Sequence, residues 1–331
     1  MADVLIEAAA SSQPAVVSRE RVLKRLEFGD RAFKLLCQSA ALFVLIVLGG
    51  VFVSLIGGAW PAFRTFGLSF FTNSSWNPVT EKFGAVAPIY GTLVTSLIAM
   101  VIAVPIGLGI AIFLTELCPR SLRQPIGTAI ELLAGIPSII YGIWGLFVFA
   151  PFMQAWVQTP LINAFENVPL LSTLFGGPAY GIGMLTASLI LAIMVLPFIT
   201  AVSRDVFDTV PPVLKESAYG LGCTTWEVVS NIVIPYTRVG VIGGCMLGLG
   251  RALGETMAVT FVIGNAHRIS GSIMAPGTTI SATIANEFTE AVGELHTSSL
   301  IAVGLILFMI TFVVLALARL MLMRLEAQAG K

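Results

Sequence analysis

Residues 204–240 read RDVFDTVPPVLKESAYGLGCTTWEVVSNIVIPYTRVG and separate two long apolar stretches. Pro211 and Pro212 suit the first turn of a helix, because the backbone N–H groups of that turn have no partner within the helix. We expect this helix to run through Val213–Tyr219. It should stop near Gly220–Gly222, because glycine readily takes the left-handed conformation that ends helices.

A second short helix is expected in the same stretch. Thr224 is followed three residues later by Glu227, which is the spacing of a capping box, where each side chain satisfies the other's free backbone N–H. This helix should cover Trp226–Val233 and end at Pro235, which cannot continue it. Two short helices joined by a glycine turn predict a compact knob that projects from a membrane.

The composition of the chain is that of a membrane protein. Of its 331 residues, 56% are hydrophobic and 11% are charged, and the mean hydropathy is +0.93. An ordinary soluble domain is about 25% charged, and a membrane helix needs roughly 20 mainly apolar residues. We predict an all-α polytopic protein with six spans: 35–56, 88–114, 126–150, 182–202, 239–264 and 298–322. The formal net charge of zero does not indicate a nucleic-acid partner.

The distribution of lysine and arginine predicts that both termini are cytoplasmic. Basic residues gather in residues 1–34, in the loops after spans two and four, and at the C-terminal end. The opposite side carries Arg64, Lys82 and Arg268. Cytoplasmic loops are the ones that hold the excess of basic residues. Residues 1–34 lack the apolar stretch of a secretory signal peptide, so none is expected there.

We expect four segments along the chain: a cytoplasmic tail (1–34), the first transmembrane helix with an external loop (35–87), the main transmembrane domain (88–322) with its cytoplasmic loop (204–238), and a second cytoplasmic tail (323–331). Arg19–Leu36 has the pattern of a helix that lies on the membrane surface before it turns into the first span. A solvated charged tail is the alternative. The outside loops either dock a partner or only cap the helix bundle.

The knob carries a motif: Glu216-Ser217-Ala218, then Gly222, and then Ile232, Ile234 and Pro235. It resembles the signature loop of ABC importer permeases, which reads Glu-Ala-Ala, three residues, Gly, nine residues, Ile-x-Leu-Pro. Every spacing matches, although Ser217 replaces one alanine and Ile234 replaces leucine. In that family the loop forms a coupling helix that fits a groove on the ATP-hydrolysing subunit. The alternative is a helical hairpin without a partner.

A second stretch, GLGRALGETMAVTFVIGN at residues 248–265, resembles the fifth span of phosphate-specific ABC permeases, where Arg-Ala-Leu-Gly-Glu-Thr is a hallmark. The Met-Ala-Val that follows is closer to the PstC-type subunit than to its PstA-type sister. The resemblance covers nearly the whole chain from the first span onward. It implies a type I ABC importer permease fold and a location in a bacterial inner membrane.

The resemblance implies the permease subunit of an ATP-driven, binding-protein-dependent importer of inorganic phosphate. Such a subunit alternates access together with a PstA-type sister permease, two ATP-binding subunits and an external phosphate-binding protein. It has no catalytic residue and binds no cofactor, because ATP and Mg²⁺ belong to the ATPase. The sequence GxxxxGK[ST] of a phosphate-binding loop is accordingly absent. A permease for sulfate, molybdate or phosphonate is the first alternative, and an ion-coupled secondary transporter is the second.

Two charged residues lie in the predicted fifth span, where each costs about 2.5–3.5 kcal/mol. Arg251 and Glu255 are four residues apart, so they would share one helix face and partly neutralise each other. The planar fork of a guanidinium suits two phosphate oxygens at once. We therefore expect Arg251, Glu255 and Thr256 to line the translocation pathway, with Arg251 on the anion and Glu255 restraining Arg251. A structural ion pair is the alternative.

The same span is rich in glycine, which lets helix backbones approach closely. These glycines are Gly240, Gly244, Gly248, Gly250 and Gly254. We expect them to pack against neighbouring helices, and a hinge is the alternative.

No metal site is expected. The four cysteines do not have the spacing of a zinc site: Cys37, Cys118, Cys223 and Cys245. His267 and His296 lie far apart in one outside loop, and the sequence shows no carboxylate cluster beside them.

Overall fold

A computed structural model describes the backbone of residues 16–329 and the side chains of residues 29–169 and 171–324. The chain divides into two compact units between Gly57 and Gly58. Within the described residues the regular elements are helices, and the isolated bridge between Asn77 and Lys82 is the one strand-like pairing. The all-α class predicted from the sequence is confirmed.

The first unit holds most of helix α2 (Val16–Phe66), which is continuous. No turn therefore separates the predicted surface helix at Arg19–Leu36 from the first span. Its placement on the membrane surface stays a prediction, as do the four predicted segments of the chain. Residues 1–15 of the predicted tail, and residues 330–331 at the other end, lie outside the described residues.

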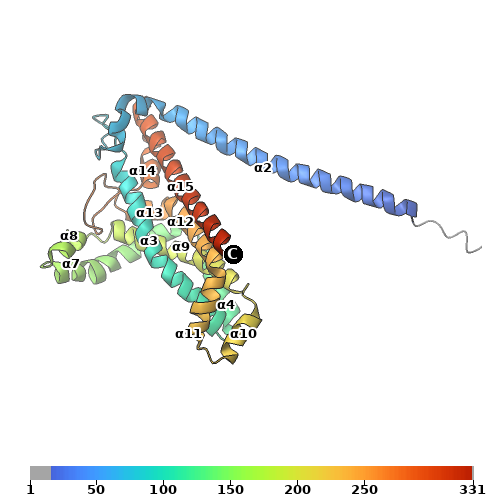
Figure 1. Ribbon diagram of the computed structural model, residues 1–331. Helices are drawn as coiled ribbons and strands as arrows, with labels where there is room; N and C mark the ends of the chain where they lie inside the picture. Colours follow the sequence, from blue (N-terminus) through green and yellow to red (C-terminus); the bar gives the residue numbers. More distant parts are fainter. Residues whose placement is uncertain (1–15, 330–331) are drawn as a thin grey trace, which may run out of the picture. The chain divides into compact units, whose positions relative to one another are not determined.

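The second unit continues with seventeen short or long helical elements, several of them single 3₁₀ or π turns (Figure 1). In chain order they are η1 (Gly67–Phe71), α3 (Val86–Ile112), η2 (Phe113–Leu117), α4 (Arg120–Ala134), α5 (Ser138–Trp144), η3 (Gly145–Phe149), α6 (Ala150–Phe152), η4 (Met153–Gln158), α7 (Thr159–Phe165), α8 (Pro169–Phe175), α9 (Met184–Phe207), α10 (Pro212–Gly220), α11 (Thr225–Val228), η5 (Val229–Val233), α12 (Ile234–Leu253), α13 (Met257–Val262) and α14 (Ile280–Glu287). Helix α15 (Glu294–Ala329) follows them.

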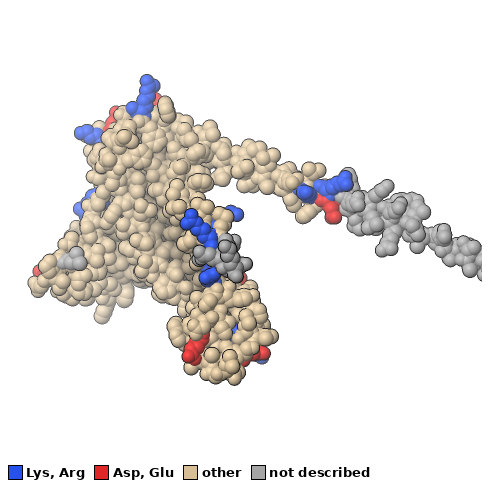
Figure 2. All heavy atoms as spheres, viewed as in Figure 1, with Lys and Arg blue, Asp and Glu red and all other residues tan. Residues whose placement is uncertain are grey.

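Six helical stretches of the described chain are long and apolar enough to cross a membrane, so the predicted number of spans is confirmed. They are Gly29–Phe71, Val86–Leu117, Ser138–Phe165, Met184–Phe207, Thr225–Leu253 and Glu294–Arg324. Helix α3 runs from the end of the second unit that holds η1 and α14 to the end that holds α4, α10 and α11 (Figure 1). We call these the loop end and the knob end. Most of the visible surface between them is neither basic nor acidic (Figure 2).

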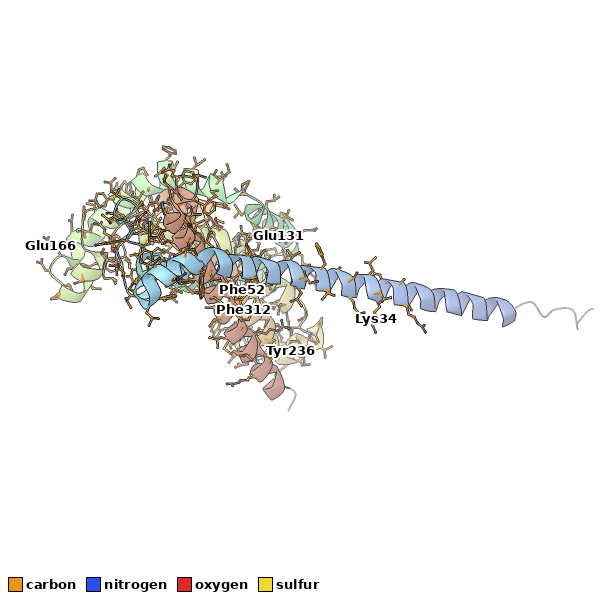
Figure 3. The ribbon with its side chains drawn as sticks, turned by 90° about the horizontal axis from the view of Figure 1, so that it is seen from above. Lys34, Phe52, Glu131, Glu166, Tyr236 and Phe312 are labelled. Carbon is orange, nitrogen blue, oxygen red and sulfur yellow. The ribbon has the colours of Figure 1, made fainter. Side chains whose placement is uncertain are left out.

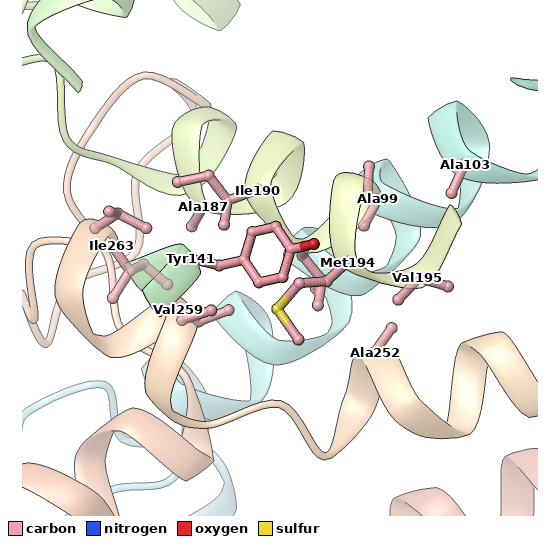
Figure 4. Packing of buried hydrophobic residues seen from close by; sticks show 14 of the residues in the cluster. Ala99, Ala103, Tyr141, Ala187, Ile190, Met194, Val195, Ala252, Val259 and Ile263 are labelled. Carbon is pink, nitrogen blue, oxygen red and sulfur yellow. The ribbon is translucent and has the colours of Figure 1, made fainter. Parts of the chain in front are cut away.

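Helix α9 is the centre of the second unit, and α3, α4, α12 and α13 pack around it. Its Ile190 and Val195 are completely buried. The residues of α3 and α12 in the same core cluster are small, namely Ala99, Ala103 and Ala252 (Figure 4). Small residues let helix backbones approach closely, which is how membrane helices gain packing contacts without a hydrophobic driving force.

The third span begins later than predicted. The sequence favours a span over residues 126–150, but α4 ends before Pro137 and the span is Ser138–Phe165. Proline lacks an N–H and disfavours helical backbone in the residue before it, so it separates the two helices. The amphipathic α4 pairs its Glu131 (labelled in Figure 3) and Arg123 with charges near the end of α9.

The two helices expected in the knob are partly as predicted. The first is α10, and Gly222 beyond it has a φ of +87°, in the left-handed region. The capping box is confirmed, because the Glu227 carboxylate accepts the N–H of Thr224 at 2.7 Å and Thr224 Oγ1 accepts the N–H of Glu227 at 3.4 Å. The predicted stop at Pro235 is wrong, since the π turn η5 carries α11 into α12. A π turn widens the helix just before Pro235, whose ring nitrogen has no hydrogen to donate.

Three of the predicted packing glycines lie against α9. A Cβ at Gly240, Gly244 or Gly248 would come within 2.6, 2.9 or 3.0 Å of side-chain atoms of that helix. The neighbouring Gly243 has no such atom within 4 Å. The stripe spaced by four residues therefore brings α12 close to α9.

Replacement of Gly244 by alanine should destabilise the chain, whereas replacement of Gly243 should not. The new methyl group would press on Val202, a stiff β-branched residue, and overpacking of this kind costs about 1–3 kcal/mol. Gly243→Ala should be neutral or stabilise by up to about 1 kcal/mol through helix propensity. Thermal unfolding of the purified chain in detergent measures both variants, and equal changes would contradict this packing.

Candidate functional site

Helix α12 ends between the two charged residues that the sequence pairs. Its last residue is Leu253 and Gly254 is the C-cap, so Arg251 lies in the last turn and Glu255 lies beyond the helix. The expected sharing of one helix face is therefore wrong. The Glu255 carboxylate accepts the N–H of Ala258 at 3.3 Å, in the first turn of α13. A carboxylate is favoured there because the first N–H groups of a helix lack partners within it.

Arg251 lies over an aromatic ring. Its Cζ atom is 4.4 Å from the ring centroid of Phe198 on α9, which is a cation–π distance. Its Nε atom is buried and has no hydrogen-bond partner among the described residues. A buried donor without a partner costs about 1–3 kcal/mol, so the arrangement favours an acceptor that the described residues do not provide.

The other predicted residues of this site have local roles. Thr256 Oγ1 donates to the carbonyl oxygen of Gly254 at 3.4 Å, within the link between α12 and α13. A Cβ at Gly250 would lie 3.7 Å from Leu315 of α15, and Gly254 ends the helix. Phe198 is missed by the sequence analysis. One feature of the sequence could have pointed to Phe198. It is an aromatic residue that directly follows the proline inside an otherwise mostly aliphatic span.

The residues of the signature motif divide between the inside and the surface of the knob. Ala218 is buried with Val228 and Val233, whereas Glu216 is exposed. Ser217 donates through Oγ to the carbonyl oxygen of Val213 at 2.7 Å, within α10. The small residue holds α10 on the knob core, and the acidic residue faces outward. Gly222 forms the turn, Ile232 lies half-buried in η5, and Ile234 and Pro235 begin α12.

The knob also exposes large apolar side chains. Leu221 is 86% exposed, Trp226 is 71% exposed, and Val213 is 68% exposed. Large apolar side chains exposed on a projecting element favour a protein-binding surface. The knob therefore has the character of a docking element.

The knob end is held together by ion pairs that no local sequence pattern predicts. Lys215 Nζ donates to Glu116 Oε1 at 2.6 Å and joins α10 to η2. The others join α4 to the end of α9, and they are Arg123 with Asp208 and Arg204 with Glu131. An acidic residue at the end of an apolar span, as in FLTEL at residues 113–117, is the available signal in the sequence.

Both histidines of the chain meet one carboxylate at the loop end. His267 Nε2 is 2.9 Å from Glu287 Oε1, and His296 Nε2 is 3.0 Å from Glu287 Oε2. Trp76 Nε1 donates to Glu287 Oε2 at 2.6 Å and its ring stacks on His267, with centroids 5.4 Å apart. No local pattern in the sequence predicts a carboxylate beside the histidines, but the structure places Glu287 between them. Among the residues with described side chains, no group of three or more acidic, histidine or cysteine residues could hold a metal ion.

Glu287 is the centre of this cluster. Burial acts to raise the pKa of Glu287, but the hydrogen bonds from His267, Trp76 and His296 favour the ionised form and hold the pKa below its ordinary value. The ionised carboxylate thereby links the loop between η1 and α3, the segment after α13, the end of α14 and the start of α15.

The sequence has close relatives among transport proteins. Residues 103–326 match the family described as binding-protein-dependent transport system inner membrane component. The chain is 67% identical to the phosphate transport system permease protein PstC of Mesorhizobium japonicum, over 98% of this chain and 100% of the relative. It is 60% identical to PstC of Pasteurella multocida, over 88% and 91%. It is 39% identical to the probable PstC of Methanocaldococcus jannaschii, over 83% and 88%.

Solved ABC transporters share the fold at low sequence identity. A chain of a bacterial ABC transporter involved in alginate import aligns with a TM-score of 0.59 at 17% identity, over 92% of this chain and 99% of that one. A chain of the MetNI methionine ABC transporter aligns with a TM-score of 0.55 at 15% identity, over 72% and 95%. The predicted type I importer permease fold is confirmed. The chain belongs to the binding-protein-dependent transport system inner membrane components, among the PstC-type phosphate permeases.

Proposed function

We propose that this chain is the permease subunit of an ATP-driven importer of inorganic phosphate. Family membership implies a companion permease, an ATPase and an external binding protein. In this proposal the companion is a PstA-type permease, one of two ATP-binding subunits docks on the knob, and a phosphate-binding protein docks at the loop end. ATP and Mg²⁺ bind to the ATPase, and the knob end and both termini face the cytoplasm.

The environment of Arg251 is the observation that supports an oxyanion substrate. Its buried Nε donor has no partner among the described residues, and the guanidinium rests on Phe198. The adjoining backbone between Leu253 and Met257 is not helical. Non-helical backbone at membrane depth is tolerated where it is buried in protein or lines a cavity, and broken helices are common at transport sites. Phosphate is favoured over other oxyanions by the names of relatives up to 67% identical.

The mechanism that follows is alternating access. When the ATPase closes on ATP, it moves the knob, and the helix bundle opens toward the docked binding protein. Phosphate then reaches Arg251, whose planar fork donates to two of its oxygens. The Glu255 carboxylate accepts the N–H of Ala258 and fixes the start of α13. In this mechanism its role is to hold the non-helical link between α12 and α13 in place. This replaces the restraint of Arg251 that the sequence suggested for Glu255.

Arg251→Gln should lower phosphate uptake strongly. A hydrogen bond to a charged group contributes about 1.5–3 kcal/mol, so uptake at limiting phosphate should fall by about tenfold or more. The assay is ATP-dependent uptake of labelled phosphate into proteoliposomes that contain both permeases and the ATPase, with the binding protein added and sulfate or molybdate as competitors. Arg319→Gln, at an exposed arginine of α15, is the matched control.

Three results would count against the proposal. Normal phosphate uptake by an assembled Arg251→Gln complex would show that Arg251 does not bind the transported phosphate. Suppression of phosphate uptake by sulfate or molybdate would assign another oxyanion. Uptake that is indifferent to ATP would indicate a secondary transporter.

A further inference from the structure

The knob is joined to a membrane-spanning helix by a buried ion pair. Lys215 of α10 donates to Glu116 of η2 at 2.6 Å, and the two side chains are only 18% and 6% exposed. At the same end the carboxylates of Asp208 and Glu131, which pair with arginines of α4 and α9, are 48% and 47% exposed. The Glu116–Lys215 ion pair is thus much better shielded from water than the other ion pairs between elements of the knob end.

Shielding makes this ion pair a firm connection. A buried carboxylate is costly unless it is paired, and the attraction between opposite charges increases as water is excluded. Separation of Glu116 from Lys215 would leave a charge stranded in a poorly hydrated place. The two elements should therefore keep their contact when either of them is displaced.

The remaining contacts of α10 are less directional. Ala218 packs in an apolar cluster with Ala111 of α3 and with Val228, Val233 and Val241. Apolar contacts of this kind can slide, because dispersion attraction has little dependence on direction. Among the described side chains, Lys215 supplies the hydrogen bond that ties α10 to a spanning helix. It is placed one residue before Glu216 of the signature motif.

We infer that Glu116 is a positioning residue that fixes Lys215, and with it α10, to the end of the span that begins with α3. A displacement of α10 then moves α3, which packs along the central helix α9. This inference rests on the proposed function, in which the ATPase docks on the knob. According to this inference, the Glu116–Lys215 ion pair transmits the movement of α10 to the spanning helix α3.

The test compares Glu116→Gln, Lys215→Met and the charge-exchanged double variant Glu116→Lys/Lys215→Glu in the assembled transporter. Two rates are measured in proteoliposomes with the binding protein present, namely ATP hydrolysis and phosphate uptake, and their ratio is the readout. The matched control is Arg123→Gln/Asp208→Asn, which removes a more exposed ion pair at the same end. Assembly and thermal unfolding of each complex are measured in parallel.

We expect each single variant to hydrolyse ATP within about threefold of wild type while uptake per ATP falls by about tenfold, because the stranded charge loosens the contact. The double variant should recover most of the ratio, and the control should keep it. A wild-type ratio in an assembled Glu116→Gln complex would overturn the inference. An assembled double variant that stays uncoupled would also overturn it, even if the single variants fail to assemble. Absence of ATP-driven uptake in the wild-type complex would instead refute the proposed function.

Discussion

Replacement of Gly91 by alanine is expected to prevent the chain from folding stably. A Cβ at this position of α3 would lie 1.8 Å from the carbonyl oxygen of Thr278, which is far inside van der Waals contact. The neighbour is backbone, so it cannot rotate away as a side chain would. It is also held in place, because Thr92 Oγ1 accepts the N–H of Ile280 at 2.9 Å. Overpacking costs about 1–3 kcal/mol and occasionally more, and we expect more than 3 here.

The matched control for this variant is Gly109→Ala. Gly109 lies in the same helix and has no neighbouring atom within 4 Å of an added Cβ, so alanine should be neutral or mildly stabilising there. The two variants are compared by accumulation in the membrane and by thermal unfolding in detergent. A Gly91→Ala midpoint within about 2 °C of wild type would mean that α3 and the segment before α14 do not touch as described.

The parts of the fold that the sequence predicts are those encoded by neighbouring residues. Apolar stretches of sufficient length predict six spans, and six are found among the described residues. The proline pair at Pro211 and Pro212 predicts the start of α10, and the Thr224–Glu227 spacing predicts a capping box that is present. Each of these signals depends on side chains within one or two helical turns of each other. The sequence of that short segment is therefore enough to predict it.

The sequence does not predict where the spans break when two local signals compete. Pro137 lies inside a run of apolar residues, and hydropathy favours a continuous span although proline favours a break. Charges four residues apart pair only if the backbone between them is helical. Gly254 stands between Arg251 and Glu255 and ends the helix. Pro235 does not end the helix, because the π turn η5 precedes it and α12 continues through it.

The contacts between distant residues could not be predicted from one sequence. Phe198 lies under Arg251, and Glu116 pairs with Lys215 across 99 positions. Glu287 binds Trp76 across 211 positions. Such pairs arise from how the spans pack, and no local pattern records them. The candidate site was therefore predicted as a set of residues on one span, and the partners of Arg251 were not.

Replacement of Glu287 by alanine is expected to loosen the loop end. The carboxylate accepts hydrogen bonds from Trp76, His267 and His296, so its removal leaves three largely buried donors without their partner. Hydrogen bonds to charged groups contribute about 1.5–3 kcal/mol each, and effects within one cluster are not additive, so we expect a loss of about 3–5 kcal/mol. Thermal unfolding at neutral pH measures it. Glu290→Ala, at an exposed acid of the same segment, should change the stability by less than about 0.5 kcal/mol.

The pH dependence tests whether Glu287 stabilises the loop end as an ionised carboxylate. The pKa of Glu287 in the folded chain is below its ordinary value of 4.5, so the stabilisation is complete above pH 4.5 and is lost as the pH falls through the folded value. The difference in unfolding midpoint between wild type and Glu287→Ala should therefore shrink as the pH falls from about 4.5 through the folded pKa of Glu287. A difference that stays the same from about pH 5 down to about pH 3 would show that Glu287 does not hold the loop end as an ionised acceptor.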